Sequence, residues 1–484
     1  MTSPMQTLRK FLAAGLLLVL VFACDKEQPF KPGPPPTPPP GPGTAPAAVE
    51  LPKKELRGAW MATVWGIDYP QDARGETALK AKYRQYLDLY QQIGINAVFF
   101  QVRSKADAWY ASAYEPWSKT ITGTPGQDPG WDILKFLVDE THARGMQFHA
   151  WINPYRIETG SGGVFPELDP KIPKALTKDY QRIRVYNPAL PEVRDRIAAI
   201  VKEIITKYPV DGLHMDDYFY PSLQKGESMN DDAEFAKYGS AFSKVEDFRR
   251  DNISKLIRKI QQTIIDTRPE VIFSISPQGN YDNNYNTQYI DVAACAKNGW
   301  FDVLIPQLYW TGTLFSSRLQ WFLSKSSKVH LLVGYGIYRY EAGASGGFDS
   351  PASFNTCYNL ARGNNKVEGC LFYNSTALTK NNVGITDAIK SAFRPKVLPP
   401  YLGRTEERKP AAPTGLKLSG AILTWSGSGA YYAVYKLEPG GKKASLVGTA
   451  REKSFNLPAK GTFHVTALGA DNAESKISEG IVYK

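Results

Sequence analysis

Apolar runs of strand length alternate with amphipathic stretches of helix length from about residue 55 to residue 395. The runs are nearly continuous in hydrophobic residues, as parallel strands buried on both faces are. They lie at 56–65, 96–103, 146–155, 211–220, 271–280, 302–310, 330–339 and 369–376. Several intervening stretches end in glycine, a common helix terminus, as at Gly94 and Gly145. Eight such units predict an α/β fold, a (β/α)8 TIM barrel over residues 55–400.

An open doubly wound sheet is the alternative with the same alternation. It is disfavoured because no glycine-rich phosphate turn follows the first predicted strand. After residue 401 the pattern changes to short alternating segments separated by Gly and Ser turns. We expect a linker at 401–412 and a small all-β, fibronectin type III-like sandwich at 413–484, with Trp425 in its core.

The first residues indicate an address in the cell envelope. Arg9 and Lys10 precede the apolar run FLAAGLLLVLVFA, which has the length of a signal-peptide core rather than of a membrane span. The run ends at Ala23-Cys24, a loose lipobox, so we expect a lipoprotein signal peptide at 1–24 with Cys24 as the lipidation site. A Pro/Gly-rich linker at 25–54 follows. The alternative is an ordinary secretory signal with a chance cysteine.

This address predicts a bacterial envelope protein, lipid-anchored on the periplasmic or cell-surface face. The net charge of +11 is scattered along the chain, and no nucleic-acid motif accompanies it, so no nucleic-acid partner is expected. The aromatic content of 12% suits the stacking of rings on sugar faces. Cys295, Cys357 and Cys370 match no metal site. A Cys357–Cys370 disulfide is one option in an oxidising compartment.

The segment VDGLHMDDYFYP, residues 210–221, carries the strongest chemical signal. On a strand, Leu213 and Met215 point to one face, and His214 and Asp216 to the other. A carboxylate on the inner face at the C-terminal end of a barrel strand is typical of a catalytic group. The neighbouring carboxylates of Asp216 and Asp217 also suggest two pKa values driven apart. The alternative is a polar strand end without chemistry.

Amides, arginines and aromatic rings stand at the other predicted strand ends, as in a sugar-binding cleft. By alternation, His149, Trp151, Asn153 and Tyr155 are expected to share one face. We predict a polysaccharide substrate bound by Arg103, Asp107, Trp117, His149, Trp151, Asn153, Tyr155, Arg156, His214, Tyr218, Gln278, Gln307, Tyr309, Trp310 and Asn374.

A metal site is an alternative if His149, His214 and Asp216 converge at the strand ends. No HxH or HxxxH spacing supports it, so neither a metal nor a cofactor is predicted.

Five motifs, in order, resemble the glycosyl-hydrolase-like family of bacterial envelope lipoproteins. They are ELRGAWMATVWGIDYP, QVRSKADAWYASAYEPWS, HAWINPYR, DGLHMDDYFYP and SISPQGN. The resemblance implies a barrel glycosidase acting on an N-acetylhexosamine polymer, such as peptidoglycan strands stripped of their stem peptides. One departure is visible: Ser104, Lys105 and Ala106 stand where a Pro-x-Gly turn is expected before Asp107.

The mechanism stays open at this point. Asp216 needs a second carboxylate, and Asp217, Glu115 and Glu341 are candidates. Retaining glycosidases hold two carboxyl groups roughly 5–5.5 Å apart, and inverting ones about 6.5–9.5 Å apart. Alternatively, the substrate's acetamido oxygen acts as the nucleophile, a scheme that the adjacent pair favours. The rival functions are a non-catalytic glycan-binding lipoprotein and a hydrolase of another polysaccharide. The sequence does not indicate the oligomeric state.

Overall fold

The computed structural model describes residues 49–160, 162–223, 225–404 and 407–484. The predicted signal peptide, Cys24 and most of the 25–54 linker lie outside these residues. Within the described ranges, no helix is both long enough and apolar enough to cross a bilayer.

Eight parallel strands close into a barrel, which confirms the predicted fold class. Around the barrel the order of neighbours is β1, β11, β10, β9, β8, β7, β3 and β2. Each strand falls in a predicted apolar run or overlaps it, but most are shorter than the run. Their bounds are β1 (Leu56–Met61), β2 (Ala97–Arg103), β3 (Gln147–Ile152), β7 (Gly212–Met215), β8 (Ile272–Ile275), β9 (Val303–Leu304), β10 (His330–Gly336) and β11 (Val367–Tyr373).

The alternation of side chains along the strands separates two apolar layers. On β7, Leu213 and Met215 belong to the large cluster that also contains the apolar faces of the helices. Trp60, Phe99 and Trp151 belong to a second cluster inside the barrel, and the imidazole of His214 contacts it. The predicted facing of Leu213, His214 and Met215 is therefore confirmed.

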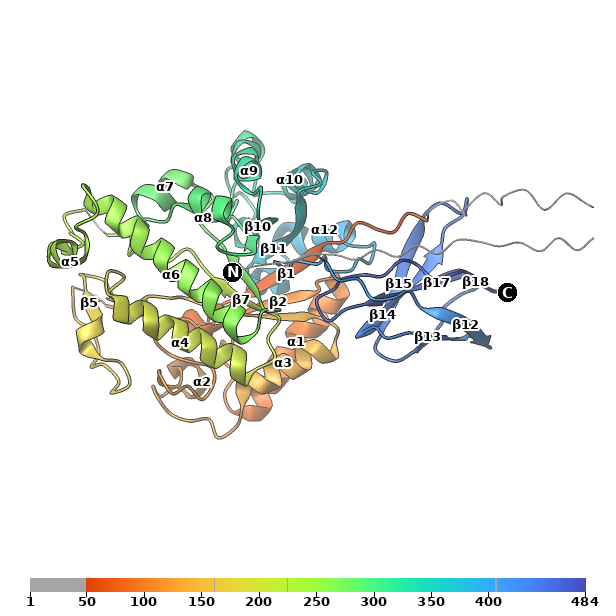
Figure 1. The fold of residues 1–484 in the computed structure, drawn as a ribbon, viewed down its shortest axis with the longest axis horizontal. Coiled ribbons are helices and arrows are strands. Elements are labelled where there is room, and N and C mark those ends of the chain that lie inside the picture. Colours follow the sequence, from red (N-terminus) through yellow and green to blue (C-terminus); the bar gives the residue numbers. More distant parts are fainter. Residues whose placement is uncertain (1–48, 161, 224, 405–406) are drawn as a thin grey trace, which may run out of the picture. The chain divides into compact units, whose positions relative to one another are not determined.

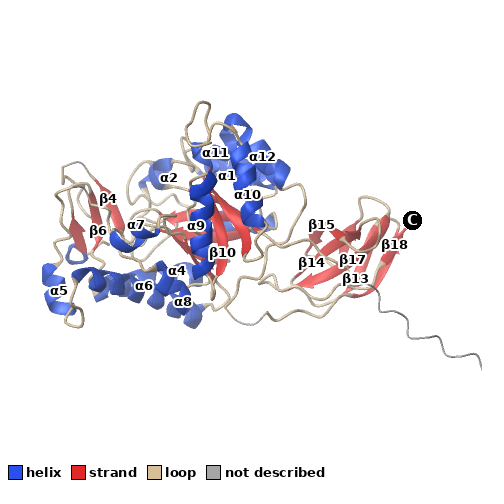
Figure 2. Ribbon diagram, turned by 90° about the horizontal axis from the view of Figure 1, so that it is seen from above, coloured by secondary structure: helices blue, strands red, loops and turns tan. Residues whose placement is uncertain are grey.

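Helices surround the strands, as Figures 1 and 2 show. The longer ones are α1 (Glu76–Ile93), α3 (Ile133–Ala143), α4 (Pro191–Lys207), α6 (Val245–Thr267), α9 (Gly312–Lys325) and α10 (Ala352–Arg362). The shorter ones are α2 (Lys119–Thr122), α5 (Asp232–Tyr238), α7 (Tyr281–Asn286), α8 (Val292–Asn298), α11 (Ser375–Lys380) and α12 (Ile385–Ala392). Helix α1 ends where expected, because Gly94 takes the left-handed conformation (φ 95°) and its N–H bonds the carbonyl of Tyr90.

The connections after the strands carry further short elements. Four 3-10 turns are η1 (Val64–Gly66), η2 (Lys174–Leu176), η3 (Ile337–Arg339) and η4 (Asn382–Gly384). After β3 the chain builds a small antiparallel sheet of order β4-β6-β5. Its strands are β4 (Arg156–Thr159), β5 (Thr177–Asp179) and β6 (Ile183–Tyr186). The residues directly after β1, β3 and β10 thus stand in turns and added strands that the barrel pattern does not predict.

The C-terminal region folds as two antiparallel sheets, as the change of pattern predicts. One has the order β12-β13-β16 and the other β15-β14-β17-β18. Their bounds are β12 (Thr414–Ser419), β13 (Ile422–Ser426), β14 (Tyr431–Leu437), β15 (Ala444–Ala450), β16 (Ser454–Asn456), β17 (Gly461–Leu468) and β18 (Ile481–Tyr483). Trp425 of one sheet packs against Tyr432 of the other, with ring centroids 5.3 Å apart. Trp425 therefore lies in the core of this region, where it was expected.

Candidate active site

A cavity of about 460 Å³ opens at the C-terminal ends of the barrel strands. Its wall combines two carboxylates, two arginines, several amides and a large number of aromatic rings. The lining residues are Trp60, Val64, Trp65, Ile67, Gln101, Trp151, Arg156, Asp216, Asp217, Tyr218, Ser276, Gln278, Gly279, Asn280, Asn283, Gln307, Tyr309, Trp310, Tyr338, Arg339 and Tyr373. Strand ends in barrels of this kind are where catalytic groups stand.

Asp216 lies directly after β7 and is 3% exposed. Two side chains from the end of β3 hold its carboxylate. Trp151 Nε1 donates to Oδ2 at 3.0 Å, and Asn153 Nδ2 donates to Oδ1 at 3.2 Å. The backbone N–H of Tyr218 also donates to Oδ1, at 3.4 Å. The carboxyl group is therefore fixed in position on the cavity wall.

Asp217 is half-buried and is held from the opposite side. Gln278 Nε2 donates to Oδ2, and Gln307 Nε2 donates to Oδ1, each at 3.1 Å. The two glutamines follow β8 and β9, and each has a further hydrogen bond: Gln307 Nε2 donates to the carbonyl of Ser276 at 2.9 Å, and Asn283 donates to Gln278 Oε1 at 3.2 Å. Strands on two sides of β7 thus hold the two neighbouring carboxylates separately.

Burial and mutual repulsion keep a proton on this pair. Loss of hydration, and after it the charge of Asp217, raise the pKa of Asp216 to about 7, against the lowering effect of Arg156 and of the Trp151 hydrogen bond. Burial also raises the pKa of Asp217, against the hydrogen bonds from the two glutamines. The site therefore offers one protonated and one ionised carboxyl group just below neutral pH, the arrangement that acid–base chemistry requires.

A neutral histidine lies below the carboxylates, inside the barrel. Trp60 Nε1 donates to His214 Nε2 at 3.0 Å, so Nδ1 carries the proton and is 2.8 Å from Ser274 Oγ. Burial lowers the pKa of His214 well below its ordinary value. His149 stacks on Phe99 with ring centroids 4.2 Å apart, and burial lowers the pKa of His149 to about 4. Neither histidine lines the cavity, so the structure does not support the prediction that His149 and His214 contact the substrate.

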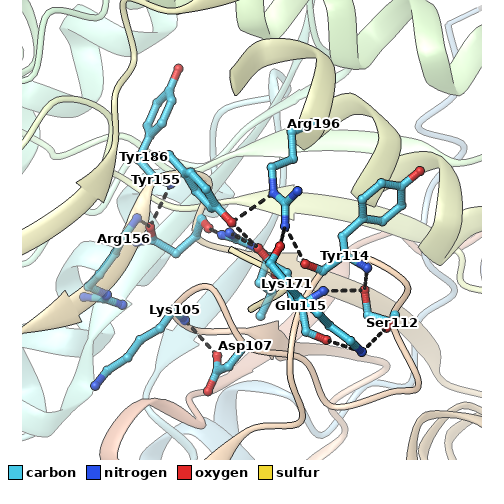
Figure 3. A network of polar contacts seen from close by, with 12 residues as sticks. Lys105, Asp107, Ser112, Tyr114, Glu115, Tyr155, Arg156, Lys171, Tyr186 and Arg196 are labelled. Atoms are coloured by element: carbon cyan, nitrogen blue, oxygen red, sulfur yellow. Dashed lines mark hydrogen bonds and ion pairs between the residues drawn. The ribbon is translucent and has the colours of Figure 1, made fainter. Parts of the chain in front are cut away.

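Arg103 and Glu115 also lie away from the cavity. They form a bidentate ion pair, Nε to Oε2 and Nη2 to Oε1, each 2.6 Å long, and both residues are 1% exposed. Figure 3 shows Glu115 among further polar neighbours, which include Ser112 and Tyr186. The guanidinium also donates to the carbonyl of Asn153, the residue that holds Asp216. The structure therefore withdraws Glu115 as the second carboxylate and Arg103 as a substrate contact. Instead, the pair supports the backbone at Asn153.

Four more predicted contacts lie elsewhere. Asp107 caps its own loop, accepting from the Lys105 N–H at 3.0 Å. Trp117 packs against the large apolar cluster between the strands and the helices, and Tyr155 is buried within that cluster. Asn374 caps α11 by accepting from the Ala377 N–H at 3.1 Å. Tyr155 misses the expected face because β3 ends at Ile152, beyond which alternation no longer holds.

The structure does bring most of the other predicted residues together. Asp216, Asp217, Trp151, Arg156, Tyr218, Gln278, Gln307, Tyr309 and Trp310 all line the cavity, and Asn153 reaches Asp216 from behind. Glu341, the other candidate for the second carboxylate, is exposed and does not line the cavity.

Sequence reasoning missed Trp60, Trp65, Tyr338 and Arg339, all of which line the cavity. Trp65 stands in η1 with a left-handed backbone (φ 52°), and its turn is held by Gln101, whose Oε1 accepts from the N–H groups of Thr63 and Val64 at 3.0 Å. A signal was available, since both tryptophans belong to the first resemblance motif. Tyr338 and Arg339 lie in η3, beyond the reach of strand alternation.

No three His, Cys, Asp or Glu side chains gather as metal ligands within the described ranges. Cys295, Cys357 and Cys370 are buried free thiols, so the disulfide considered above is not formed.

Comparisons with known proteins identify the family of the chain. Residues 55–343 match the model of a family described as glycosyl hydrolase-like 10. The chain belongs to this family. Over 481 residues it is 33% identical to "Glycosyl hydrolase YngK" of Bacillus subtilis (strain 168), covering 88% of this chain and 93% of that protein. "Glycosyl hydrolase DigH" of Escherichia coli (strain K12) is 34% identical over 333 residues, covering 61% of this chain and 76% of that one.

Two solved structures share less sequence with this chain. The PgaB (BpsB) glycoside hydrolase domain from Bordetella bronchiseptica is 10% identical, with a TM-score of 0.45 over 70% of this chain and 99% of that one. The α-L-fucosidase isoenzyme 2 from Paenibacillus thiaminolyticus is 14% identical, with a TM-score of 0.45 over 70% of this chain and 49% of that one. Neither likeness bears on activity.

Proposed function

We propose that the protein is a glycosidase that hydrolyses an N-acetylhexosamine-containing glycan of the cell envelope, with peptidoglycan strands free of stem peptides as its substrate. Membership of the glycosyl hydrolase-like 10 family supports the reaction class. The observation that carries the proposal is the position of Asp216 and Asp217 among exposed rings. A site that only binds sugar has no need of a buried carboxyl whose pKa lies near 7.

The exposed rings gather at this one cavity. Among the described residues, the large hydrophobic side chains that remain exposed include just three aromatic ones, Trp65 (61%), Tyr338 (51%) and Tyr218 (46%). All three line the cavity. Leaving a ring in water forfeits its burial energy, and rings that project from a cleft are suited to stack on the apolar faces of sugars. Sugar units on several sides of the carboxylates would find such a surface.

The carboxylates then divide the reaction. Asp216, the more buried and more readily protonated group, gives its proton to the oxygen of the leaving sugar. Asp217, whose carboxylate accepts hydrogen bonds from two glutamine amides, orients the acetamido group of the substrate, whose carbonyl oxygen attacks the anomeric carbon. Water then attacks the anomeric carbon of the cyclic intermediate and gives one of its protons to Asp216, while the acetamido group is restored. Two adjacent carboxyl groups suffice for this scheme because the nucleophile is the acetamido oxygen of the substrate, so neither aspartate has to attack the anomeric carbon.

We expect turnover to fall as the pH rises through about 7. Above its pKa of about 7 Asp216 loses the proton that the leaving oxygen requires. Below that pH, turnover declines again when Asp217 becomes protonated. A kcat profile between pH 4 and pH 9 on a soluble oligosaccharide checks this. Turnover that keeps rising to pH 9 would show that no protonated carboxyl takes part.

Removal of the exposed rings weakens substrate binding. Trp65→Ala and Tyr338→Ala are each expected to lower the affinity for long glycan strands by about 1–3 kcal/mol, the scale of a lost aromatic contact. Titration calorimetry in an inactive Asp217→Asn background measures this. Ile265→Ala, which removes an exposed hydrophobic side chain on α6 outside the cavity, is the control. Unchanged affinity in both ring variants would mean that the glycan lies elsewhere.

The remaining parts fit an envelope enzyme. We propose that Cys24 carries a lipid anchor, that residues 25–54 hold the barrel away from the membrane, and that the C-terminal sheets are a fibronectin type III-like module. Three-stranded and four-stranded antiparallel sheets with a shared Trp425 core support the module assignment. Replacement of Cys24 by Ser, followed by fractionation of cells into membrane and soluble parts, tests the anchor: a protein that stays in the membrane fraction contradicts it.

A further inference from the structure

Arg156 is a buried cation without a carboxylate partner. It is 4% exposed, and no Asp or Glu oxygen of the described residues lies within ion-pair distance of it. Other buried arginines are paired: Arg57 lies 3.0 Å from Glu55, and Arg103 lies 2.6 Å from Glu115. Burial of a charge is costly unless an opposite charge and hydrogen bonds offset it. An arginine left unpaired on a cavity wall therefore points to an anionic ligand.

The guanidinium of Arg156 is also held in place before any ligand arrives. Its Nε and Nη2 donate to the carbonyl of Ser104 at 3.1 and 3.0 Å. The Cζ atom of Arg156 lies 4.6 Å from the ring centroid of Tyr218 and 5.8 Å from that of Trp65. These neighbours come from three separate loops, after β2, β7 and β1. Fixing the side chain in advance lowers the entropy cost of binding, and the planar fork suits a carboxylate.

The charges around the cavity favour an acidic sugar as well. Asp216 senses Arg156, whose charge lowers the pKa of that carboxyl against the effect of burial, although the two are not in ion-pair contact. When Asp216 carries the catalytic proton, it no longer offsets the charge of Arg156. Arg339, on the wall formed after β10, is likewise without a carboxylate partner among the described residues; it donates to the carbonyl of Tyr309 and lies over Phe348.

We propose that Arg156 binds a carboxylate carried by a sugar next to the bond that is cleaved. The inference rests on the proposed function and narrows the substrate to glycans with free carboxyl groups. Such a group comes either from a lactyl ether on an amino sugar or from a uronic acid. A peptide attached to the lactyl group converts its carboxylate into an amide, which removes the charge that Arg156 recognises. Selectivity for strands without stem peptides follows directly.

Binding in the Asp217→Asn background tests this without any need for turnover. One probe is the tetrasaccharide from amidase-treated peptidoglycan, with free lactyl carboxylates; the other is the same tetrasaccharide with those carboxyls converted to primary amides. We expect amidation to weaken binding at least about tenfold, the scale of a lost charge-assisted hydrogen bond. Arg156→Gln should weaken binding of the carboxylate form by a similar factor and leave the amide form unchanged.

Two variants serve as controls. Arg74→Gln removes an exposed positive charge that does not line the cavity, and it should leave the ratio between the affinities for the two probes unchanged. Arg156→Lys keeps the positive charge but lacks the planar guanidinium, and it should retain part of the preference for the carboxylate probe over the amide probe. If Arg156→Gln does not fold, the proposal is tested by comparing Arg156→Lys with the parent background. The quantity compared is the ratio of the affinities for the carboxylate and amide tetrasaccharides.

Equal affinity for the two tetrasaccharides, or an equal loss for both in Arg156→Gln, overturns the proposal. A hyaluronan tetrasaccharide that binds more tightly than the lactyl form, and does so through Arg156, supports carboxylate binding with a uronic acid as its source. A separate digestion by the parent protein distinguishes the two proposals. Carboxylate preference without any hydrolysis contradicts the glycosidase assignment alone, and hydrolysis without preference contradicts the role of Arg156 alone.

Discussion

Replacement of Asp216 or Asp217 by Asn lowers kcat on a soluble N-acetylhexosamine oligosaccharide by at least about a hundredfold, the loss typical of missing acid–base catalysis. Each variant removes one of the two groups between which the reaction is divided, and Asn preserves the size of the side chain. Initial rates of reducing-end release, for parent and variants, measure the effect. Near-normal turnover in both variants would contradict the assignment of the site.

An aryl glycoside separates the two roles. Its leaving group departs without a proton, so Asp216→Asn should recover much of its loss on this substrate, while Asp217→Asn should not. The reverse result would exchange the roles of the two carboxyls within the same site.

Stability provides the folding control for Asp216→Asn. The folded-state pKa of Asp216, about 7, lies above its ordinary value of 3.8, so its contribution to stability is lost as the pH rises through about 7. Asn removes this ionisation cost. The variant should therefore unfold at no lower temperature than the parent at pH 8, and lost turnover then reflects chemistry.

Glu115→Ala lowers the free energy of unfolding by about 3–5 kcal/mol, because it leaves Arg103 buried and unpaired. Both residues are 1% exposed, so water cannot replace the lost contact to Arg103. Chemical denaturation with parallel kcat measurements tests this. The control is Asp139→Ala, which breaks an exposed ion pair with Lys135 and should leave the free energy of unfolding close to that of the parent. A Glu115→Gln protein as stable as the parent but inactive would restore Glu115 as a catalytic acid.

The sequence predicts the barrel because buried parallel strands and amphipathic helices leave strong, regular patterns. It also predicts the carboxylate pair, since the facing of Asp216 follows from Leu213 and Met215 on one short strand. Alternation fails where the strand is irregular. The pairing of β2 with β3 shifts register between Gln101 and Arg103, so Arg103 does not share the environment of Gln101.

Beyond the strand ends, long-range contacts decide the position of each side chain. Glu115 reaches Arg103 through a loop conformation that no periodicity encodes, and this removes both residues from the site. The turns that carry Trp65 and Tyr338 are equally hidden from hydrophobic patterning. Residue type alone does not separate Arg103 from Arg156, since only the fold shows which arginine has found a carboxylate.

The most direct test of the central claim is mass spectrometry of the products released from amidase-treated peptidoglycan by the purified protein and by its Asp216→Asn variant. The proposed function predicts free oligosaccharides from the parent and at most about one hundredth as much from the variant. Saturable binding of the strands by a folded parent protein, with no oligosaccharide released, would contradict it and identify the protein as a glycan-binding member of its family.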